Sequence, residues 1–242
     1  MIRAGWIGFV FVAAVGSAWS QSFNIDVGPE GSTPPASYAA AGLAGVWNNV
    51  RADHVTPYTP GPTPQDVMLV DINGVPTSVG FHQYGGQDLV ADDDPGTSGA
   101  HAKLLDDHLA THSATLESCM YLNGLEDGPY EVLIYAWMPN DPGVMQKTRF
   151  DFHPGFEIVG GTWTGAHEEG VTFSRHLVEA ENGFLGFHVG IPPGGALFPG
   201  AAFNGFQVIQ LEAAPVPALT PIVVALLGVG LALAGAWRLR AS

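Results

Sequence analysis

Alternation of hydrophobic and polar residues with a period of two dominates the middle of the chain. Residues 22–28 are the clearest case, because Phe23, Ile25 and Val27 would share one face of a strand. Other segments rich in apolar, aromatic and β-branched residues predict further strands at residues 67–72, 116–122, 130–137, 148–152, 171–178, 184–189 and 206–211. Only His101–His112 has a pattern typical of a helix, and it predicts a short one.

Four Asn-Gly dipeptides lie between these segments, at Asn73, Asn123, Asn182 and Asn204. Asn-Gly tolerates positive φ at both central positions of a tight turn, so it is the strongest short signal for a β-hairpin. The best case is Asn182–Gly183, which is flanked by strand segments on both sides. Many short strands with turn signals between them predict an all-β fold, an antiparallel β-sandwich with one short helix.

The first 20 residues have the parts of a secretory signal peptide. Arg3 supplies the positive start, residues 5–15 supply a short apolar stretch, and Ala18-Trp19-Ser20 supplies the small residues of a cleavage site. We therefore expect residues 1–20 to be removed during export, so that the mature protein begins near Gln21. Retention as an uncleaved anchor is the alternative.

The last 21 residues predict a transmembrane helix followed by a basic tail. Residues 222–237 are a run of 16 apolar or small residues without charge. Counted from Leu219, the run would span about 28 Å as a helix, enough to cross a thin bilayer. Arg238 and Arg240 follow it, and basic residues place this end in the cytoplasm and the acidic domain outside. A stalk that contains three prolines precedes the run. The chain therefore divides into a signal peptide (1–20), an ectodomain (21–212), the stalk (213–221) and the helix with its tail (222–242).

The C-terminal tail resembles the bacterial protein-sorting signals of the PEP-CTERM and IPTL-CTERM type. Those signals combine a short Pro-containing motif, one hydrophobic helix and an Arg-rich end, which correspond here to residues 216–221, residues 222–237 and the pair Arg238 and Arg240. The order Val216-Pro217-Ala218-Leu219 is closer to the IPTL type. The resemblance implies that a membrane-embedded sorting enzyme recognises and cuts the tail. A plain single-pass anchor is the alternative.

Several short blocks of the ectodomain resemble exported bacterial domains of jelly-roll, galactose-binding-like form. The blocks are residues 23–28, 69–71, 104–107, 122–125, 128–132 and 203–208. The most distinctive pattern is Gly-Leu-x-x-Gly-x-Tyr-x-Val, which covers residues 124–132. The resemblance implies a jelly-roll sandwich, and related domains often bind sugars.

The charge of the ectodomain excludes a nucleic-acid-binding protein. Three of the eight basic residues lie in the terminal segments, which leaves five basic against 23 acidic residues and a formal net charge of −18 in the middle. Binding phosphates requires a basic patch, so we expect no nucleic-acid partner. The acidic excess does attract divalent cations. Asp92, Asp93 and Asp94 are candidate oxygen ligands for Ca²⁺, the one cofactor that the sequence suggests, with a solvated acidic loop as the alternative.

Two tryptophans are candidate ligand-binding residues, because aromatic faces stack on sugar rings. Trp163 lies in the polar, glycine-rich segment 160–165, whereas Trp137 continues an apolar strand and equally fits the core. No catalytic residue is predicted, since the chain has no Gly-x-Ser-x-Gly motif and its carboxylate pairs lack a spacing that would set them across a cleft. Cys119 is the only cysteine, which excludes an intramolecular disulfide, and we interpret it as a small buried side chain.

Together these features predict a non-catalytic, exported β-sandwich that is sorted to the bacterial cell surface or envelope and serves in matrix, adhesion or glycan contact. The expected partners are the export machinery, the sorting enzyme, an extracellular glycan, and the membrane through the C-terminal helix. An envelope enzyme that acts on polysaccharide and a purely structural surface component are the two alternatives.

Overall fold

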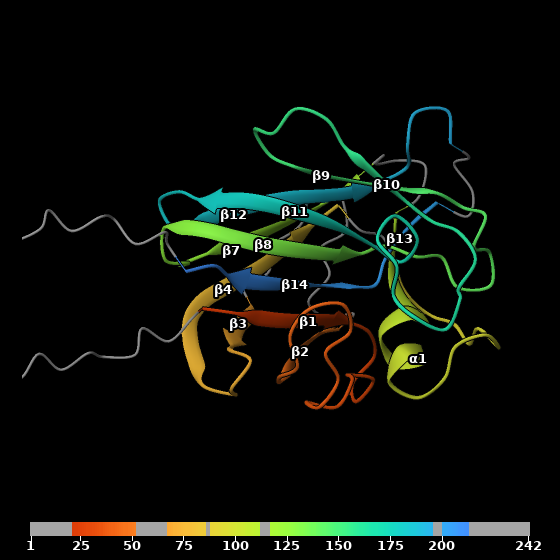
Figure 1. Cartoon of the computed structure of the whole chain (residues 1–242), viewed down its shortest axis with the longest axis horizontal. Coiled ribbons are helices and arrows are strands. Elements are labelled where there is room, and N and C mark those ends of the chain that lie inside the picture. Colours follow the sequence, from red (N-terminus) through yellow and green to blue (C-terminus); the bar gives the residue numbers. More distant parts are fainter. Residues whose placement is uncertain (1–20, 52–66, 86–87, 112–116, 196–199, 213–242) are drawn as a thin grey trace, which may run out of the picture.

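The computed structural model describes residues 21–51, 67–85, 88–111, 117–195 and 200–212. These residues form short strands in three sheets and the helix α1 (Gly99–Leu105). The two larger sheets pack against each other as a sandwich (Figure 1), which confirms a mostly β fold with one short helix. The predicted signal peptide, stalk, sorting motif and C-terminal helix lie outside the described residues.

The strands belong to two large sheets and one small one. The first sheet has the order β11 (Phe173–Ala180), β8 (Gly128–Tyr135), β14 (Gly205–Gln210), β1 (Phe23–Val27) and β2 (Trp47–Val50). The second sheet has the order β10 (Glu157–Val159), β9 (Gln146–Phe150), β12 (Phe184–Gly190), β7 (Glu117–Asn123), β4 (Pro76–Tyr84) and β3 (Val67–Val70). The third sheet has the order β13 (Ala201–Phe203), β6 (Asp107–Thr111) and β5 (Asp88–Ala91). Neighbouring strands are antiparallel throughout, except for the parallel pair β1–β2.

The core lies between the two large sheets, where alternate residues of each strand point inward. Phe206 on β14 contacts Phe187 on β12 and Phe81 on β4, with ring centroids 4.9 and 5.4 Å apart. These contacts join the first sheet to the second. Phe23, which the period-two pattern places inward, is fully buried with them.

Two local predictions were wrong. The predicted helix His101–His112 ends at Leu105, because Asp107–Thr111 is the central strand β6 of the third sheet and pairs with β5 and β13. Asn182 and Gly183 do form a tight turn with φ of 55° and 73°, but the strands on either side belong to different sheets, so it is no hairpin. Among the four Asn-Gly dipeptides, only that at Asn73 lies between two paired strands, β3 and β4.

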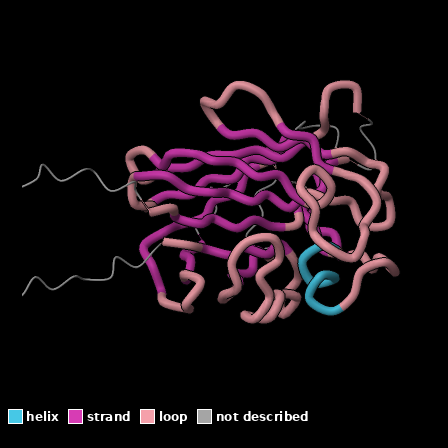
Figure 2. Tube along the Cα trace, in the orientation of Figure 1, coloured by secondary structure: helices cyan, strands magenta, loops and turns pink. Residues whose placement is uncertain are grey.

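Both ends of the described chain lie at the same end of the sandwich, opposite α1 (Figures 1 and 2). Gln21 and Gln210 contact each other there, since the backbone N–H of Gln21 donates to Gln210 Oε1 at 2.6 Å. Within the described residues, no helix has the length and apolar character needed to cross a membrane.

Candidate functional site

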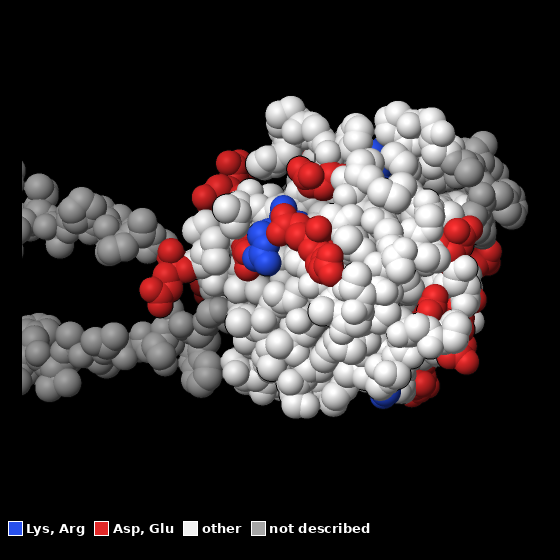
Figure 3. Space-filling view, turned by 45° about the vertical axis from the view of Figure 1, so that its right-hand side comes forward, with Lys and Arg blue, Asp and Glu red and all other residues white. Residues whose placement is uncertain are grey.

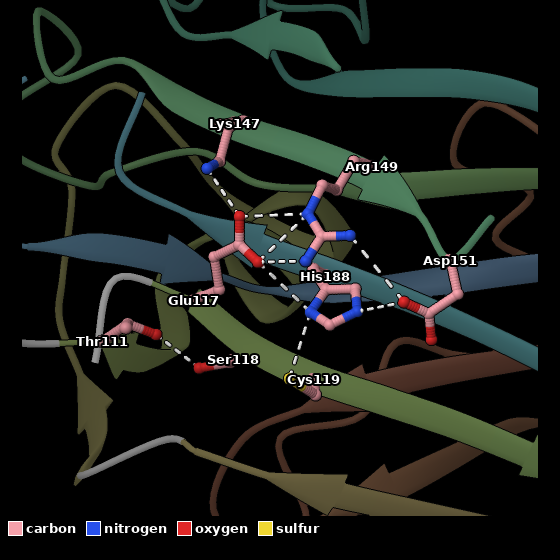
Figure 4. Close-up of polar contacts among 8 residues, drawn as sticks. All are labelled: Thr111, Glu117, Ser118, Cys119, Lys147, Arg149, Asp151 and His188. Carbon is pink, nitrogen blue, oxygen red and sulfur yellow. Dashed lines mark hydrogen bonds and ion pairs between the residues drawn. The ribbon is translucent and has the colours of Figure 1, made fainter. Parts of the chain in front are cut away.

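The outward face of the second sheet carries a network of charged side chains. On β7, Met120 and Leu122 point into the core, so Glu117, Cys119 and Tyr121 point outward. The strand order then places His188 on β12 between Cys119 on β7 and Arg149 on β9. We call the five ionisable residues that join in this network, Glu117, Lys147, Arg149, Asp151 and His188, the charged row (Figure 4).

Glu117 lies at the centre of the charged row. Its carboxylate accepts hydrogen bonds from Arg149 Nε at 3.1 Å and from Arg149 Nη2 at 2.5 Å, and it pairs with Lys147 Nζ at 2.5 Å. Arg149 Nη1 also lies 3.7 Å from Asp151 Oδ1. A forked Arg–carboxylate contact fixes geometry as well as charge, so these side chains hold one another in place.

His188 lies between the two carboxylates of the row. Its Nε2 is 2.6 Å from Asp151 Oδ1, and its Nδ1 is 3.3 Å from Glu117 Oε2 and 3.1 Å from Cys119 Sγ. Cys119 is half-buried on this outward face, so its interpretation as a core residue was wrong. Its position follows from the strand period, because the buried neighbours are Ser118 and Met120.

Aromatic rings adjoin the charged row on the same face. The rings of Tyr121 and Phe184 stack with centroids 5.7 Å apart, and both side chains lie next to Gly186 on β12. A Cβ at Gly186 would lie 2.4 Å from Asp151 Oδ2 and 3.1 Å from each ring, so any larger residue would push Asp151 out of its present position. Tyr84, 40% exposed, lies on β4 opposite Cys119. We call Tyr84, Tyr121 and Phe184 the aromatic strip.

The pKa values of Glu117 and Cys119 are shifted in opposite directions by their surroundings. Burial alone would raise the pKa of Glu117, but the hydrogen bonds from Arg149 and Lys147 outweigh it and lower the pKa to about 2. A general acid needs a raised pKa instead. Burial also raises the pKa of the Cys119 thiol, and the charges of Glu117 and Asp151 raise it further. A reactive thiolate needs a lowered pKa instead, although His188 contacts Cys119 through Nδ1 and Asp151 through Nε2.

Replacing Glu117 by Gln should make the protein less stable at pH 7 and less sensitive to acid. The folded-state pKa lies below the ordinary value of 4.5, so the ionised carboxylate stabilises the fold above that pH. This contribution is lost as the pH falls toward 2. Thermal melts should therefore show a similar gap between wild type and Glu117→Gln at pH 7 and pH 5 and a smaller gap at pH 3. Glu157→Gln, an exposed change on β10, is the control, and a gap that stays constant with pH would contradict the assignment.

The structure separates the two predicted tryptophans. Trp137 is 1% exposed, and its indole N–H donates to the Gly161 carbonyl at 2.8 Å, so its ring offers no open face to a sugar. Trp163 is half-buried, with its ring 5.1 Å from His101 and 5.4 Å from His167. Tyr38 Oη in turn contacts both histidines, at 2.8 and 2.6 Å. Trp163 thus packs its loop against α1, and its ring contacts no member of the charged row.

The three aspartates of the predicted calcium loop differ in their contacts and exposure. Asp94 accepts hydrogen bonds from the backbone N–H groups of Gly96 and Asn140, both at 2.7 Å. Asp92 lies 3.8 Å from His108 Nδ1, and Asp93 is exposed. Over the described part of the chain, no three His, Cys, Asp or Glu side chains are grouped so that they could hold a metal ion. The aspartates therefore do not converge on one point.

Sequence reasoning missed the charged row entirely. The signal was present in the alternation Glu117-Cys119-Tyr121 and Lys147-Arg149, where polar residues take every second position of two strands. Taken alone, the polar residues of each strand are typical of an ordinary solvated face. Only the strand order β9-β12-β7 brings the two sets together with His188 between them.

Comparison with known proteins identifies no family. No protein-family model matches the chain, and no curated protein matches it. One chain in the crystal structure of the plant peptide RALF23 in complex with FER and LLG2 aligns over 82% of this chain and 43% of its own length, with 11% identity and a TM-score of 0.41.

Two further matches are carbohydrate-active proteins. The exo-β-1,3-galactanase from Phanerochaete chrysosporium, solved with β-1,3-galactotriose, aligns over 53% of this chain and 27% of its own, with 12% identity and a TM-score of 0.32. The Arthrobacter globiformis T6 isomalto-dextranase complexed with panose aligns over 55% and 21%, with 10% identity and a TM-score of 0.31. This chain spans less than half the length of the structures that it matches, and similarity at this level assigns neither a family nor an activity.

Proposed function

We propose that this protein is an exported, non-catalytic jelly-roll domain that binds an uncharged glycan on the outward face of β4, β7, β12 and β9. One observation carries the proposal: the aromatic strip and the charged row lie side by side on that face. The sequence supports the cellular setting, with a signal peptide at residues 1–20 and a sorting-type tail at residues 216–242. In this setting the tail anchors the domain outside the cytoplasmic membrane until the sorting enzyme acts.

The two surfaces match the two chemical sides of a sugar ring. The apolar C–H face of a pyranose packs on an aromatic ring such as Tyr121, and its hydroxyls need donors and acceptors at fixed positions. Arg149, Asp151 and Glu117 provide these, with side chains 32%, 23% and 19% exposed. Arg has five donors and a carboxylate has about four acceptor sites, so each retains hydrogen-bonding capacity beyond its contacts in the row.

The balance of charge favours an uncharged ligand. Lys147 and Arg149 offset the carboxylates of Glu117 and Asp151, so the row itself carries little net charge at neutral pH. The chain as a whole is acidic, with a formal net charge of −15, and acidic side chains outnumber basic ones on the face shown in Figure 3. This excess of negative charge on the whole protein repels uronic acids, sulfated sugars and phosphates.

Electrostatics also support binding over hydrolysis. Glu117, at the centre of the row, has a lowered pKa. Carboxyls with raised pKa values occur at Asp26, Asp92, Asp106 and Asp107, none of which belongs to the charged row. A general acid needs a raised pKa and must reach the glycosidic oxygen, so these residues could serve only at a site other than the row.

Replacing Tyr121 by Ala should weaken glycan binding about tenfold, equivalent to about 1.4 kcal/mol, through loss of the stacking surface. The full chain in mild detergent is first screened on an array of uncharged hexose oligosaccharides, and the best ligand is then titrated by calorimetry. Absence of binding to every uncharged glycan would refute the proposed function.

A matched pair of arginines provides the control. Arg149→Ala should abolish most binding, whereas Arg175→Ala should leave it unchanged. Arg175 forms the same kind of ion pairs, with Glu131 and Glu169, but on the outward face of the first sheet. Loss of binding in Trp163→Ala with normal binding in Tyr121→Ala would move the site to the loop beside α1.

A further inference from the structure

A groove of about 840 Å³ opens at the end of the sandwich where the two chain ends emerge. Its walls come from the start of β8, the end of β9, the second half of β11 and the start of β12. Apolar side chains dominate the lining, including Phe152, Leu177, Val178, Phe184, Leu185 and Leu211. We call it the end groove. It shares Asp151 with the charged row and Phe184 with the aromatic strip.

Apolar groups at the end groove are unusually exposed. Phe152 is 98% exposed and has φ of 62°, Leu177 is 69% exposed, and Leu211 is 36% exposed. A fully exposed phenylalanine in a left-handed backbone conformation is unfavourable both in hydration and in backbone energy. Contiguous exposed apolar surface of this kind usually marks a contact site.

The chain itself continues from the rim of this groove. Leu211 lines the groove, and its backbone N–H donates to the Pro129 carbonyl at 2.9 Å. Glu212 comes next, and then residues 213–221, with the sequence Ala-Ala-Pro-Val-Pro-Ala-Leu-Thr-Pro. This stalk is apolar and uncharged, and its three prolines prevent regular strand pairing while favouring an extended polyproline conformation.

We propose that the stalk, residues 213–221, docks in the end groove of the same molecule. At about 3.1 Å per residue in the polyproline conformation, nine residues reach about 28 Å, which suffices to follow the groove. Pro-rich segments bind aromatic-lined apolar grooves elsewhere by packing proline rings on aromatic faces, and Phe152 and Phe184 offer such faces. Because the stalk is tethered at Leu211, even weak affinity gives substantial occupancy.

Charge favours the stalk over a lipid surface as the occupant. The groove is also lined by Asp151, Glu179 and Glu181, and the two glutamates are exposed. These carboxylates repel anionic headgroups, whereas they neither attract nor repel an uncharged segment. Docking would cover Val216 and Pro217, so the sorting motif would become accessible only when the stalk leaves the groove. This inference does not depend on glycan binding.

Cysteine accessibility tests the proposal in the full chain. Val216→Cys is introduced, and its rate of maleimide alkylation is followed by mass spectrometry, which distinguishes residue 216 from Cys119. The measurement is repeated with Leu177→Asp, which puts a charge in the groove wall at an exposed position. We expect Leu177→Asp to speed alkylation at residue 216 about fivefold or more, since it releases the tethered stalk. Met68→Asp, 57% exposed on β3, is the matched control and should leave the rate unchanged.

Each other outcome overturns the proposal. Equal rates in all three backgrounds would mean that the groove does not hold the stalk. A groove-dependent rate that varies with protein concentration would assign the groove to a second copy of the chain. Protection that occurs only in lipid nanodiscs, and not in mild detergent, would assign it to the membrane surface.

Discussion

Replacing Asn204 by Ala should lower the free energy of unfolding by about 3 kcal/mol or more, because one side chain satisfies three buried backbone groups. Asn204 is 0% exposed, between β13 and β14. Its Oδ1 accepts the backbone N–H of Trp137 at 2.6 Å, and its Nδ2 donates to the carbonyls of Leu105 and Asp107 at 2.8 and 3.1 Å. Alanine would leave all three groups without a partner, at about 1–3 kcal/mol for each one that water cannot reach.

The position of Asn204 explains why the effect should be global. Its three contacts join the segment just after β8, the end of α1 and the start of β6, so it connects the third sheet to the first. Chemical denaturation of the full chain measures the change. Asn123→Ala is the matched control, because Asn123 also precedes a glycine but is exposed at the end of β7, and it should change stability by less than about 0.5 kcal/mol. A loss below about 1 kcal/mol for Asn204→Ala would show that water replaces the side chain.

Asn204 also illustrates what the sequence could and could not reveal. The Asn-Gly pattern at residues 204–205 predicts a turn, but in the structure Asn204 is a single residue between β13 and β14, and neither Asn204 nor Gly205 has a positive φ. The pattern says nothing about burial or about the three backbone partners, which are 67 to 99 residues away along the chain. Local signals of this kind report backbone conformation, whereas partners depend on how the sheets assemble.

The strands were predictable for the same reason. Alternation at residues 22–28 and 184–189 depends only on which face each residue presents, and both segments are strands, β1 and β12. Strand pairing was not predictable. The turn at Asn182–Gly183 has the expected positive φ values, yet it carries the chain from the first sheet to the second. A turn with these φ values can connect strands of two different sheets as well as the two strands of a hairpin.

The candidate site depended on that unpredictable pairing. Glu117 and Arg149 are 32 residues apart, and His188 lies a further 39 residues along the chain, so the network forms only through the strand order of the second sheet. The helix prediction failed in a related way. Leu104 and Leu105 do lie in the helix, but Leu109 pairs with Phe203 and Leu89 in the third sheet, and tertiary pairing overrode the local preference.

Replacing Asp26 by Asn should stabilise the protein at neutral and alkaline pH. Asp26 is 0% exposed on β1, and its Oδ1 makes no hydrogen bond of good geometry among the described residues. Its Oδ2 accepts a hydrogen bond from Ser32 Oγ at 3.2 Å. Burial raises the pKa of Asp26 well above its ordinary value of 3.8, and the nearby negative charge of Asp107 raises it further. Asparagine has the same shape and cannot ionise.

The sign of the effect follows from proton linkage. The folded protein retains a proton on Asp26 at pH values where the unfolded chain has released it. The stabilisation that Asp26 contributes is therefore fully present below pH 3.8 and is lost as the pH rises through its folded-state pKa. Above that pKa, the wild type must hold a buried carboxylate that lacks a full set of partners. The gain for Asp26→Asn should reach about 1–3 kcal/mol there, the range for a poorly satisfied buried group.

Denaturation at pH 4 and pH 8 separates this effect from a general change in packing. Asp26→Asn should differ little from wild type at pH 4, where both side chains are neutral, and should be clearly more stable at pH 8. Asp141→Asn, an exposed change in the loop after β8, should show no difference at either pH. An equal gain at both pH values would assign the effect to hydrogen bonding rather than to charge. A lower stability of Asp26→Asn at pH 8 would mean that the ionised carboxylate has a stabilising partner. Asp26 would then belong to a binding site beside α1.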